Sequence, residues 1–474
     1  MSNSDAIDHV IMVIFENRSF DHLLGWMSHP RYGNNPQIDG LLGDIDAATN
    51  ELTTESYRNP AILQTFRPFF VETDEPLAVD LPHGRDQVLT QLAYSQVTGA
   101  YSMRGFAASY FDQNPMQAGP NVTRPDCMRM LTPPAIPVTS FLAKNYRVCD
   151  RWFTSIPTDT HPNRMMALAG YSEIDGTKTL EPDQYLALDW AEDNKVPWRV
   201  YSDDFSFMMC MRNPTTGALR GLRVLKERLL HGKYRGFSSF AHDFQYDADF
   251  PALTLIEPAF SDDPFSMEPN DNHPPLPMGP GESFLLKIYN AFFGTDLARE
   301  RFNRTAVVVY YDEHGGFFDH VPPLKLVTAS GRANTNTKWT SFTTSGPRVP
   351  AIVISPLVDA GVYKGNLDHT SVLRFLGERF GPKGEFSAEV TARHASPFAA
   401  LRSLGDVFDR SYARTPPPPP TVGGLATMSY PNGRPATTDA QRMFLEARQQ
   451  LHLDQPDAMA AHFPDGYFVA PHQQ

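Results

Sequence analysis

The chain has 474 residues, of which 41% are hydrophobic and 20% charged, and its formal net charge is −13. A chain of this length can bury a large core, and its composition is that of an ordinary globular protein. The acidic excess argues against a nucleic-acid-binding function, because a polyanion needs a basic surface and no basic run is visible. For the same reason the chain offers no polybasic anchor for an anionic membrane.

The N-terminus shows no Sec-type signal peptide, since its apolar stretch follows no basic segment and runs directly into Glu16 and Asn17. No stretch has the roughly 18 consecutive apolar residues that a membrane helix needs, so we expect no transmembrane segment. The chain is therefore expected to be cytoplasmic, or exported without a Sec signal as a secreted effector. Cys127, Cys149 and Cys210 fit neither a zinc finger nor a disulfide framework, which predicts reduced thiols.

Short apolar runs alternate with helical patterns along the chain, and this alternation is typical of an α/β fold with a mainly parallel sheet. The runs predict buried strands at 9–15, 196–201, 253–256, 305–311 and 349–355. The clearest helical patterns lie at 136–148, 281–293 and 370–380.

The alternating pattern continues to about residue 410, so residues 1–410 are predicted to form one catalytic α/β domain. Residues 411–474 are predicted to be a proline-rich linker, with the run TPPPPPT at 415–421, followed by a helical extension.

Polar side chains follow four of the predicted strands at the point where each strand ends. They are Glu16–Asn17, Asp203–Asp204, Glu257 and Asp312–Glu313–His314. Ligands of parallel sheets bind at the carboxyl ends of the strands, and carboxylate and amide oxygens suit a divalent cation, with histidine extending the choice to zinc or manganese. Simpler interpretations stay open for some of these residues. We favour a solvated loop for Asp203 and Asp204 and a turn for Asp262 and Asp263.

Two stretches carry the strongest chemical signals. Adjacent acids after a buried strand are costly unless they are paired or bind a metal, so Asp312 and Glu313 are interpreted as functional. The stretch SIPTDTHPNRMMALAG (155–170) places hydroxyls in a loop that opens a helix, where free N–H groups attract anions. Thr160 is the best-placed nucleophile, with Thr158 and Ser155 as alternatives and a plain helix N-cap as the non-catalytic interpretation.

Several motifs appear in the order seen in the bacterial and plant phosphoesterase family: ENRSFDHLLGWM, TSIPTDTHPNR, NDNHP, DEHGGFFDHVPP, RVPAIVISPLV and DHTSVLRFLGERFG. Over residues 8–382 the chain resembles this family of phosphatidylcholine-preferring and plant non-specific phospholipases C and related acid phosphatases. The stretches DLPHGRDQVLTQL and SMRGFAASY are similar to the zinc-dependent bacterial phospholipase C branch. The resemblance implies an alkaline-phosphatase-like α/β/α sandwich.

Carried over by motif, the resemblance implies one divalent metal ion, with zinc favoured and calcium or magnesium as alternatives. Its ligands would be Glu16, Asn17, Thr160, Asp312 and Glu313. Thr160 would also be the nucleophile that forms a phospho-threonine intermediate.

The resemblance further implies that three histidines contact the phosphoryl oxygens or protonate the leaving group, namely His83, His273 and His320. His22, His314 and His369 are interpreted as structural. Plant members commonly have Gln where this chain has His161, a difference that adds a metal or phosphate contact or nothing.

The expected function is a phospholipase C that cleaves glycerophospholipids such as phosphatidylcholine into diacylglycerol and a phosphorylated headgroup. Its partner would be a phospholipid or phosphate-ester substrate, with transient contact to a membrane surface. An acid phosphatase for small phosphomonoesters and a catalytically silent lipid- or partner-binding protein are the alternatives. The Met- and Phe-rich stretch at 205–211 is interpreted as core packing rather than as a lip for acyl chains.

Overall fold

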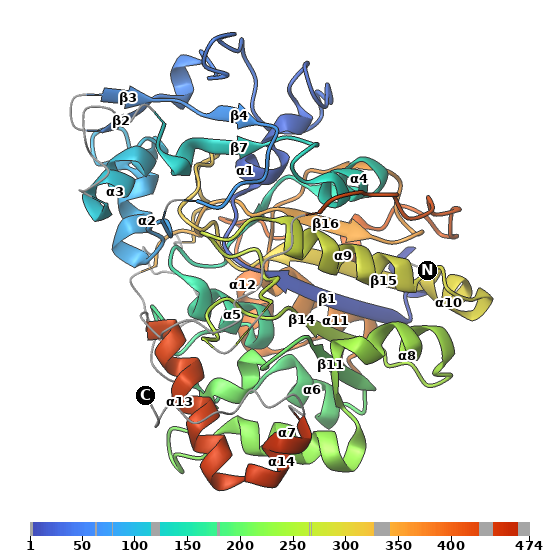
Figure 1. Ribbon diagram of the computed structural model, residues 1–474. Coiled ribbons are helices and arrows are strands. Elements are labelled where there is room, and N and C mark those ends of the chain that lie inside the picture. Colours follow the sequence, from blue (N-terminus) through green and yellow to red (C-terminus); the bar gives the residue numbers. More distant parts are fainter. Residues whose placement is uncertain are drawn as a thin grey trace.

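The computed structural model describes residues 3–61, 64–77, 79–114, 124–177, 181–264, 266, 268–326, 342–425 and 439–462. At its centre lies an eight-stranded sheet with the strand order β13-β11-β14-β1-β15-β16-β8-β17 (Figure 1). The strands are β1 (His9–Phe15), β8 (Arg147–Cys149), β11 (Trp198–Ser202), β13 (Tyr234–Gly236), β14 (Leu253–Glu257), β15 (Thr305–Tyr311), β16 (Ala351–Ile354) and β17 (Gly361–Tyr363).

Neighbouring strands run parallel throughout this sheet, except that β16 is antiparallel to both β15 and β8. The predicted α/β fold with a mainly parallel sheet is thereby confirmed, and each of the predicted strands is present. All seven residues of β15 are buried, as the continuous apolar run predicts for a strand covered on both faces.

Helices cover both faces of the sheet. The Phe15 ring stacks on Tyr311, with centroids 5.6 Å apart, and meets Phe284 of α9 edge-on at 6.0 Å. Tyr310 points to the opposite face, as neighbouring residues of a strand do, where it lies 5.0 Å from Trp152 and 5.4 Å from His369. Since His369 directly precedes α11, α9 and α11 lie on opposite sides of the sheet, and Figure 1 shows α9 crossing in front of it.

Fourteen helices longer than a single 3₁₀ turn occur in the described ranges. They are α1 (Phe20–Leu24), α2 (Arg85–Leu92), α3 (Phe106–Gln113), α4 (Pro137–Asn145), α5 (Thr160–Ala169), α6 (Ala187–Asp193), α7 (Arg220–His231), α8 (Phe240–Tyr246), α9 (Gly279–Ala291), α10 (Asp296–Phe302), α11 (Thr370–Phe380), α12 (Ala388–His394), α13 (Asp439–Asp454) and α14 (Pro456–His462). No helix of these ranges combines the length and apolar character needed to span a bilayer.

Within the described ranges, five small two-stranded sheets lie outside the central sheet. Their strands are β2 (Asn59–Ala61), β3 (Gln64–Phe66), β4 (Phe69–Val71), β5 (Tyr94–Ser95), β6 (Ala100–Tyr101), β7 (Arg129–Leu131), β9 (Trp152–Phe153), β10 (Glu181–Pro182), β12 (Met211–Arg212) and β18 (Leu367–Asp368). The three thiols are buried and form no disulfide, as expected.

The C-terminal helices pack against the rest of the chain. Phe444 of α13 contacts the rings of Phe205 and Phe260, with centroids 6.1 and 5.7 Å away. The proline-rich stretch is also held in place, because the Tyr289 hydroxyl of α9 donates to the Pro417 carbonyl at 2.6 Å. The boundary near residue 410 stays a prediction. The stretch at 205–211 is buried in the core, which confirms the packing interpretation.

Candidate active site

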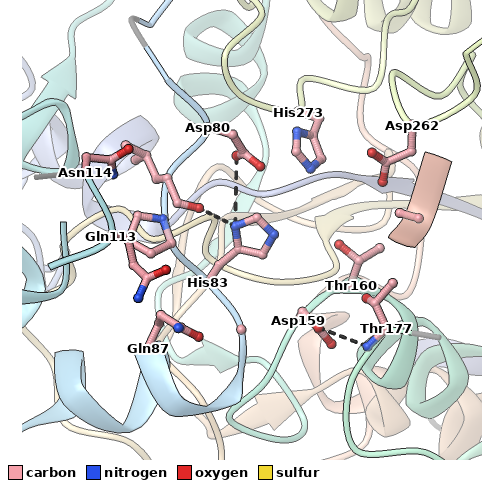
Figure 2. A pocket seen from close by; sticks show the side chains of 14 residues that line it. Asp80, His83, Gln87, Gln113, Asn114, Asp159, Thr160, Thr177, Asp262 and His273 are labelled. Carbon is pink, nitrogen blue, oxygen red and sulfur yellow. Dashed lines mark hydrogen bonds and ion pairs between the residues drawn. The ribbon is translucent and has the colours of Figure 1, made fainter. Parts of the chain in front are cut away.

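A cavity of about 470 Å³ contains Thr160 and two of the predicted histidines (Figure 2). Its lining residues come from segments far apart in the sequence and are mostly polar. They are Asp80, Leu81, Pro82, His83, Gly84, Gln87, Gln113, Asn114, Asp159, Thr160, Thr177, Asp262, His273 and Ala440.

Thr160 is the first residue of α5 and is 4% exposed. Its hydroxyl donates to Asn17 Oδ1 at 3.3 Å, and the Asn17 backbone N–H donates to Asp312 Oδ1 at 3.2 Å. Asn17 has φ +62°, a left-handed conformation that asparagine tolerates better than most residues. The turn after β1 therefore places one amide between the candidate nucleophile and the carboxylate that ends β15.

The glycine pair after Glu313 allows this close approach of two strand ends. Gly315 has φ +62°, and a Cβ added to it would lie 2.0 Å from the Asn17 carbonyl oxygen. Any other residue there would push the two loops apart. The Glu313 carboxylate uses the same turn, since Oε2 accepts from the Gly315 N–H at 2.8 Å.

Arg164 neutralises two of the predicted metal ligands. Its Nη2 lies 2.8 Å from Glu16 Oε1 and its Nε lies 3.0 Å from Asp312 Oδ2, and all three side chains are at least 97% buried. Arg164 follows Thr160 by four residues, so both lie on the same side of α5. Burial, only partly offset by Arg164, raises the pKa of Asp312 to about 7 and that of Glu16 well above its usual range.

Two carboxylate oxygens of this cluster have no hydrogen-bond partner within the described chain although they are buried, namely Glu16 Oε2 and Glu313 Oε1. A buried carboxylate oxygen without a partner is costly, and a cation satisfies it. Glu16 also lies with Asp262 and His273 in a group whose ligand atoms are within 4.8 Å of one another, an arrangement of carboxylates and a histidine that a divalent cation can bind. The residues present thus fit a divalent metal ion.

His83 and His273 lie on the other side of Thr160, with ring centroids 5.8 Å apart. Burial lowers the pKa of His83, but Glu313 and Asp80 outweigh it and raise that pKa to about 9. The pKa of His273 is also raised, because Asp80 and Asp262 outweigh the effect of burial. His83 Nδ1 faces the Leu81 carbonyl at 2.6 Å, which leaves Nε2 facing Asn17. The nearby carboxylates therefore favour the positively charged form of both rings.

His320 is not among the residues that line this cavity. Its Nδ1 lies 2.7 Å from Asp21 Oδ2 and its Nε2 lies 3.2 Å from Asp39 Oδ1. Asp21 in turn pairs with the buried Arg348 at 3.0 Å. The structure thus brings together seven of the eight predicted site residues and places the eighth in a separate ion-pair network, so the catalytic role of His320 stays a prediction without a contact to support it.

The histidines interpreted as structural make local hydrogen bonds. His22 Nδ1 lies 2.6 Å from the Arg129 carbonyl, His314 Nε2 lies 2.7 Å from Gln91 Oε1, and His369 Nε2 lies 2.7 Å from the Asp312 carbonyl. The last two bonds hold the strand end that carries Asp312 and Glu313. The His161 ring meets the Phe207 ring edge-on at 5.4 Å, and its contact to a metal or phosphate stays a prediction.

Sequence reasoning missed several residues of the site. Asp80, Asp159 and Asp262 line the cavity, and Asp262 does so from the turn that was predicted for it. Asp159 could have been noticed because it directly precedes Thr160. Arg164 is the last residue of the motif TSIPTDTHPNR. Its position one helical turn after Thr160 could have indicated that it lies beside the nucleophile and pairs with the carboxylates there. The other strand ends contribute nothing to the lining: Asp203 is exposed and Glu257 is buried elsewhere.

Comparison with known proteins identifies relatives of this chain. Non-specific phospholipase C6 of Arabidopsis thaliana is 31% identical over 363 residues, which cover 75% of this chain and 62% of that protein. Non-specific phospholipase C1 of the same plant is 29% identical over 401 residues, which cover 80% of this chain and 68% of that protein. Phospholipase C B of Mycobacterium tuberculosis (strain CDC 1551 / Oshkosh) is 26% identical over 434 residues, covering 79% and 73%. The chain spans between 62% and 68% of the length of the two plant relatives.

Among solved structures, the crystal structure of Ps i-CgsB matches with 12% identity and a TM-score of 0.29, covering 51% of this chain and 65% of that one. A likeness this weak adds nothing to the architecture seen in the sheet itself. The family model described as Phosphoesterase family matches residues 7–383. The chain belongs to the phosphoesterase family.

Proposed function

We propose that the protein is a metal-dependent phosphoesterase of the phospholipase C type, which hydrolyses glycerophospholipids such as phosphatidylcholine. The observation that carries this proposal is the Thr160 hydroxyl, 3.3 Å from Asn17 Oδ1, in a cavity that also holds His83 and His273, whose pKa values are raised by nearby carboxylates. Relatives named as phospholipases C, from a plant and from a bacterium, support the lipid substrate.

The metal ion would be held by Glu16, Asn17, Asp312, Glu313 and the Thr160 oxygen. Once bound, it would lower the pKa of the Thr160 hydroxyl and neutralise charge on the phosphoryl group. We favour zinc because of the branch that the chain resembles, whereas a donor set made only of oxygens would equally suit calcium or magnesium.

The remaining chemistry is assigned to the chain's own side chains. Thr160 Oγ releases its proton to solvent and attacks phosphorus, and the bond from phosphorus to the glycerol oxygen breaks. His273 donates a proton to that oxygen, so diacylglycerol leaves as a neutral alcohol. The headgroup phosphate stays on Thr160 until water attacks the same phosphorus and restores the hydroxyl. The positive charge of His83 stabilises the phosphoryl oxygens in both steps.

One observation favours a second candidate, an acid phosphatase. Most residues that line the cavity are polar, with Leu81, Pro82 and Ala440 among the apolar ones, which suits a small phosphomonoester as well as a lipid headgroup. The catalytically silent alternative is disfavoured, because every predicted ligand and the hydroxyl lie together.

The experiment compares phosphocholine release from phosphatidylcholine vesicles with hydrolysis of p-nitrophenyl phosphate, before and after chelation and after metal is restored. Thr160→Ala should lose both activities by at least about a hundredfold, while Thr160→Ser, which keeps a hydroxyl, should retain part of them. Phosphocholine release restored by zinc supports the proposal and identifies the metal. Hydrolysis of the soluble ester alone would instead support the phosphatase.

A further inference from the structure

A short hairpin beside the cavity carries an exposed apolar surface that the catalytic site does not explain. It consists of β5 and β6 and directly follows α2. Residues 87–103, QVLTQLAYSQVTGAYSM, contain no Asp, Glu, Lys or Arg in a chain whose net charge is −13. A stretch of 17 residues without charge is usually buried, yet the tip of this one is exposed.

The exposed fractions are large for apolar side chains. Val97 at the tip is 96% exposed, Tyr94 52% and Leu89 47%. Tyr94 pairs across the hairpin with Tyr101, and their ring centroids are 4.8 Å apart. Isolated exposed apolar residues are normal on protein surfaces, but several on one projecting element mark an interaction site.

The hairpin has a closed turn, and Tyr101 at its base packs against the hydrophobic core. The Gly99 N–H donates to the Ser95 carbonyl at 2.8 Å and closes the turn. Gly99 has φ +65°, and a Cβ added to it would meet no atom within 4 Å. The tip can therefore be covered by an outside surface without any rearrangement of the fold.

α2 connects the hairpin rigidly to the rim of the cavity. Gly84 and Gln87, at the start of this helix, line the cavity next to His83 (Figure 2). Near the end of the helix, the Gln91 Nε2 amide donates to the Pro82 carbonyl at 2.6 Å, and Gln91 Oε1 accepts from His314 Nε2 at 2.7 Å. With a rise of about 1.5 Å per residue, the eight residues of α2 set the hairpin roughly 12 Å from the rim.

We propose that the β5–β6 hairpin, with Val97 at its tip and the exposed Tyr94 behind it, inserts into the surface of a zwitterionic phospholipid bilayer together with the exposed Leu89 of the adjoining α2, and presents the cavity to it. This proposal rests on the proposed lipid substrate. Tyrosine rings have an apolar body and a polar hydroxyl and are enriched at the boundary between headgroups and acyl chains. An uncharged tip loses no ion hydration on insertion, whereas the overall acidity disfavours an anionic surface.

The first test places a reporter at the tip. The native thiols are all buried, so a cysteine introduced as Val97→Cys can be labelled selectively with an environment-sensitive dye. Leu453→Cys on α13, at a side chain that is 78% exposed, is the matched control. Both are made in the Thr160→Ala background, so that the vesicles stay intact.

Adding phosphatidylcholine vesicles should shift the emission of the dye at position 97 to the blue and raise its intensity several-fold, with no change at position 453. No change at position 97, an equal change at both positions, or a change that requires anionic lipid would overturn the proposal. Since this readout involves no hydrolysis, it stands or falls independently of the enzymatic assignment.

The second test separates lipid contact from catalysis. Val97→Asp should reduce vesicle binding and phosphocholine release from vesicles by at least about tenfold, because it replaces an apolar side chain by a charge. Hydrolysis of p-nitrophenyl phosphate should stay within about twofold, since Val97 touches neither the core nor the cavity. Unchanged vesicle binding by Val97→Asp, or an equal loss with Leu453→Asp, would overturn the proposal. If the wild-type protein hydrolyses the soluble ester but no lipid, the lipid substrate fails, while vesicle binding still decides the role of the hairpin.

Discussion

Arg164 Nη2 lies 2.8 Å from Glu16 Oε1, and neither side chain is more than 3% exposed. The same guanidinium reaches Asp312, so one cation on α5 serves two carboxylates delivered by β1 and β15. Thr160 belongs to the same helix as Arg164. The helix therefore fixes the position of the hydroxyl relative to the guanidinium that neutralises the two carboxylates.

Replacing Arg164 by Met should destabilise the protein by about 3–5 kcal/mol, since it leaves two buried carboxylates without their counter-charge. The measurement is urea unfolding at pH 7. Arg58→Met is the control, because Arg58 and its partner Glu55 are 48% and 68% exposed, and such pairs contribute about 1 kcal/mol or less. Equal losses for the two variants would contradict the role given to Arg164.

Removing the metal should lower the melting temperature, because Glu16 Oε2 and Glu313 Oε1 are then buried without partners. At a metal concentration of 100 Kd, binding stabilises the folded state by about 2.7 kcal/mol. Glu313→Gln should raise the Kd for zinc at least about tenfold, as measured by calorimetry.

Glu282→Gln is the matched control for this measurement. Glu282 is also a buried carboxylate, but it accepts hydrogen bonds from Val138 and Thr139 rather than facing the cavity. A similar loss of metal affinity in both variants would show that Glu313 is not a ligand.

His320→Gln distinguishes a catalytic from a structural histidine. Asp21 and Asp39 outweigh the burial of His320 and raise its pKa to about 9, against about 6.5 in the unfolded chain. Its charge therefore contributes stability in full below pH 6.5, roughly 3 kcal/mol, and this contribution is lost as the pH rises through 9.

The destabilisation caused by His320→Gln in urea unfolding should accordingly be larger at pH 6 than at pH 10. Hydrolysis of p-nitrophenyl phosphate by the folded variant should stay within about fivefold. A loss of a hundredfold or more, the range for a missing general acid, would restore the catalytic role predicted from the motif.

The C-terminal helices are expected to support the site from outside the region matched by the family. Phe444 packs on Phe260, whose ring lies 4.7 Å from the Arg164 guanidinium, and Arg448 pairs with Asp204 at 2.9 Å. Phe444→Ala should cost about 3–5 kcal/mol and lower activity on the soluble ester. Leu453→Ala, at an exposed position of the same helix, should change neither.

A chain ended after residue 425 tests the predicted domain boundary directly. It lacks α13 and α14 and should melt at a lower temperature, because Phe205 and Phe260 lose their cover. Unchanged melting and activity would mean that the residues up to about 410 form an independent catalytic unit.

The long strands and the core of the site could be predicted from the sequence because both rest on strong local signals. β1 and β15 are continuous apolar runs, and the acids after them had to meet at the carboxyl edge of a parallel sheet. β8, β13 and β17 were missed because each has three residues, too few to show a period. The reversed direction of β16 was not predictable either, since an apolar run carries no information on direction.

Two acids needed information that the local sequence does not carry. Asp204 was expected in a solvated loop, yet it pairs with Arg448, 244 residues further along the chain. Asp262 lies in a turn, as predicted, but the sequence did not show that this turn lines the cavity. Partners so distant in sequence leave no local pattern, so charge and neighbouring residue types alone could not reveal them.

Because β16 runs antiparallel to β15, the protein should also tolerate sequence inserted between these two strands. Since β15 ends where β16 begins, with Tyr310 opposite Ala351, the chain leaves and returns at the same edge of the sheet. The base of this excursion is closed, because the Leu326 N–H donates to the Thr343 carbonyl at 2.8 Å. Each doubling of the length of a closed loop raises the entropic cost of closing it by only about 0.6 kcal/mol. An epitope, a tag or a small domain grafted between Leu326 and Thr343 should therefore leave the carboxylates after β15 where they are.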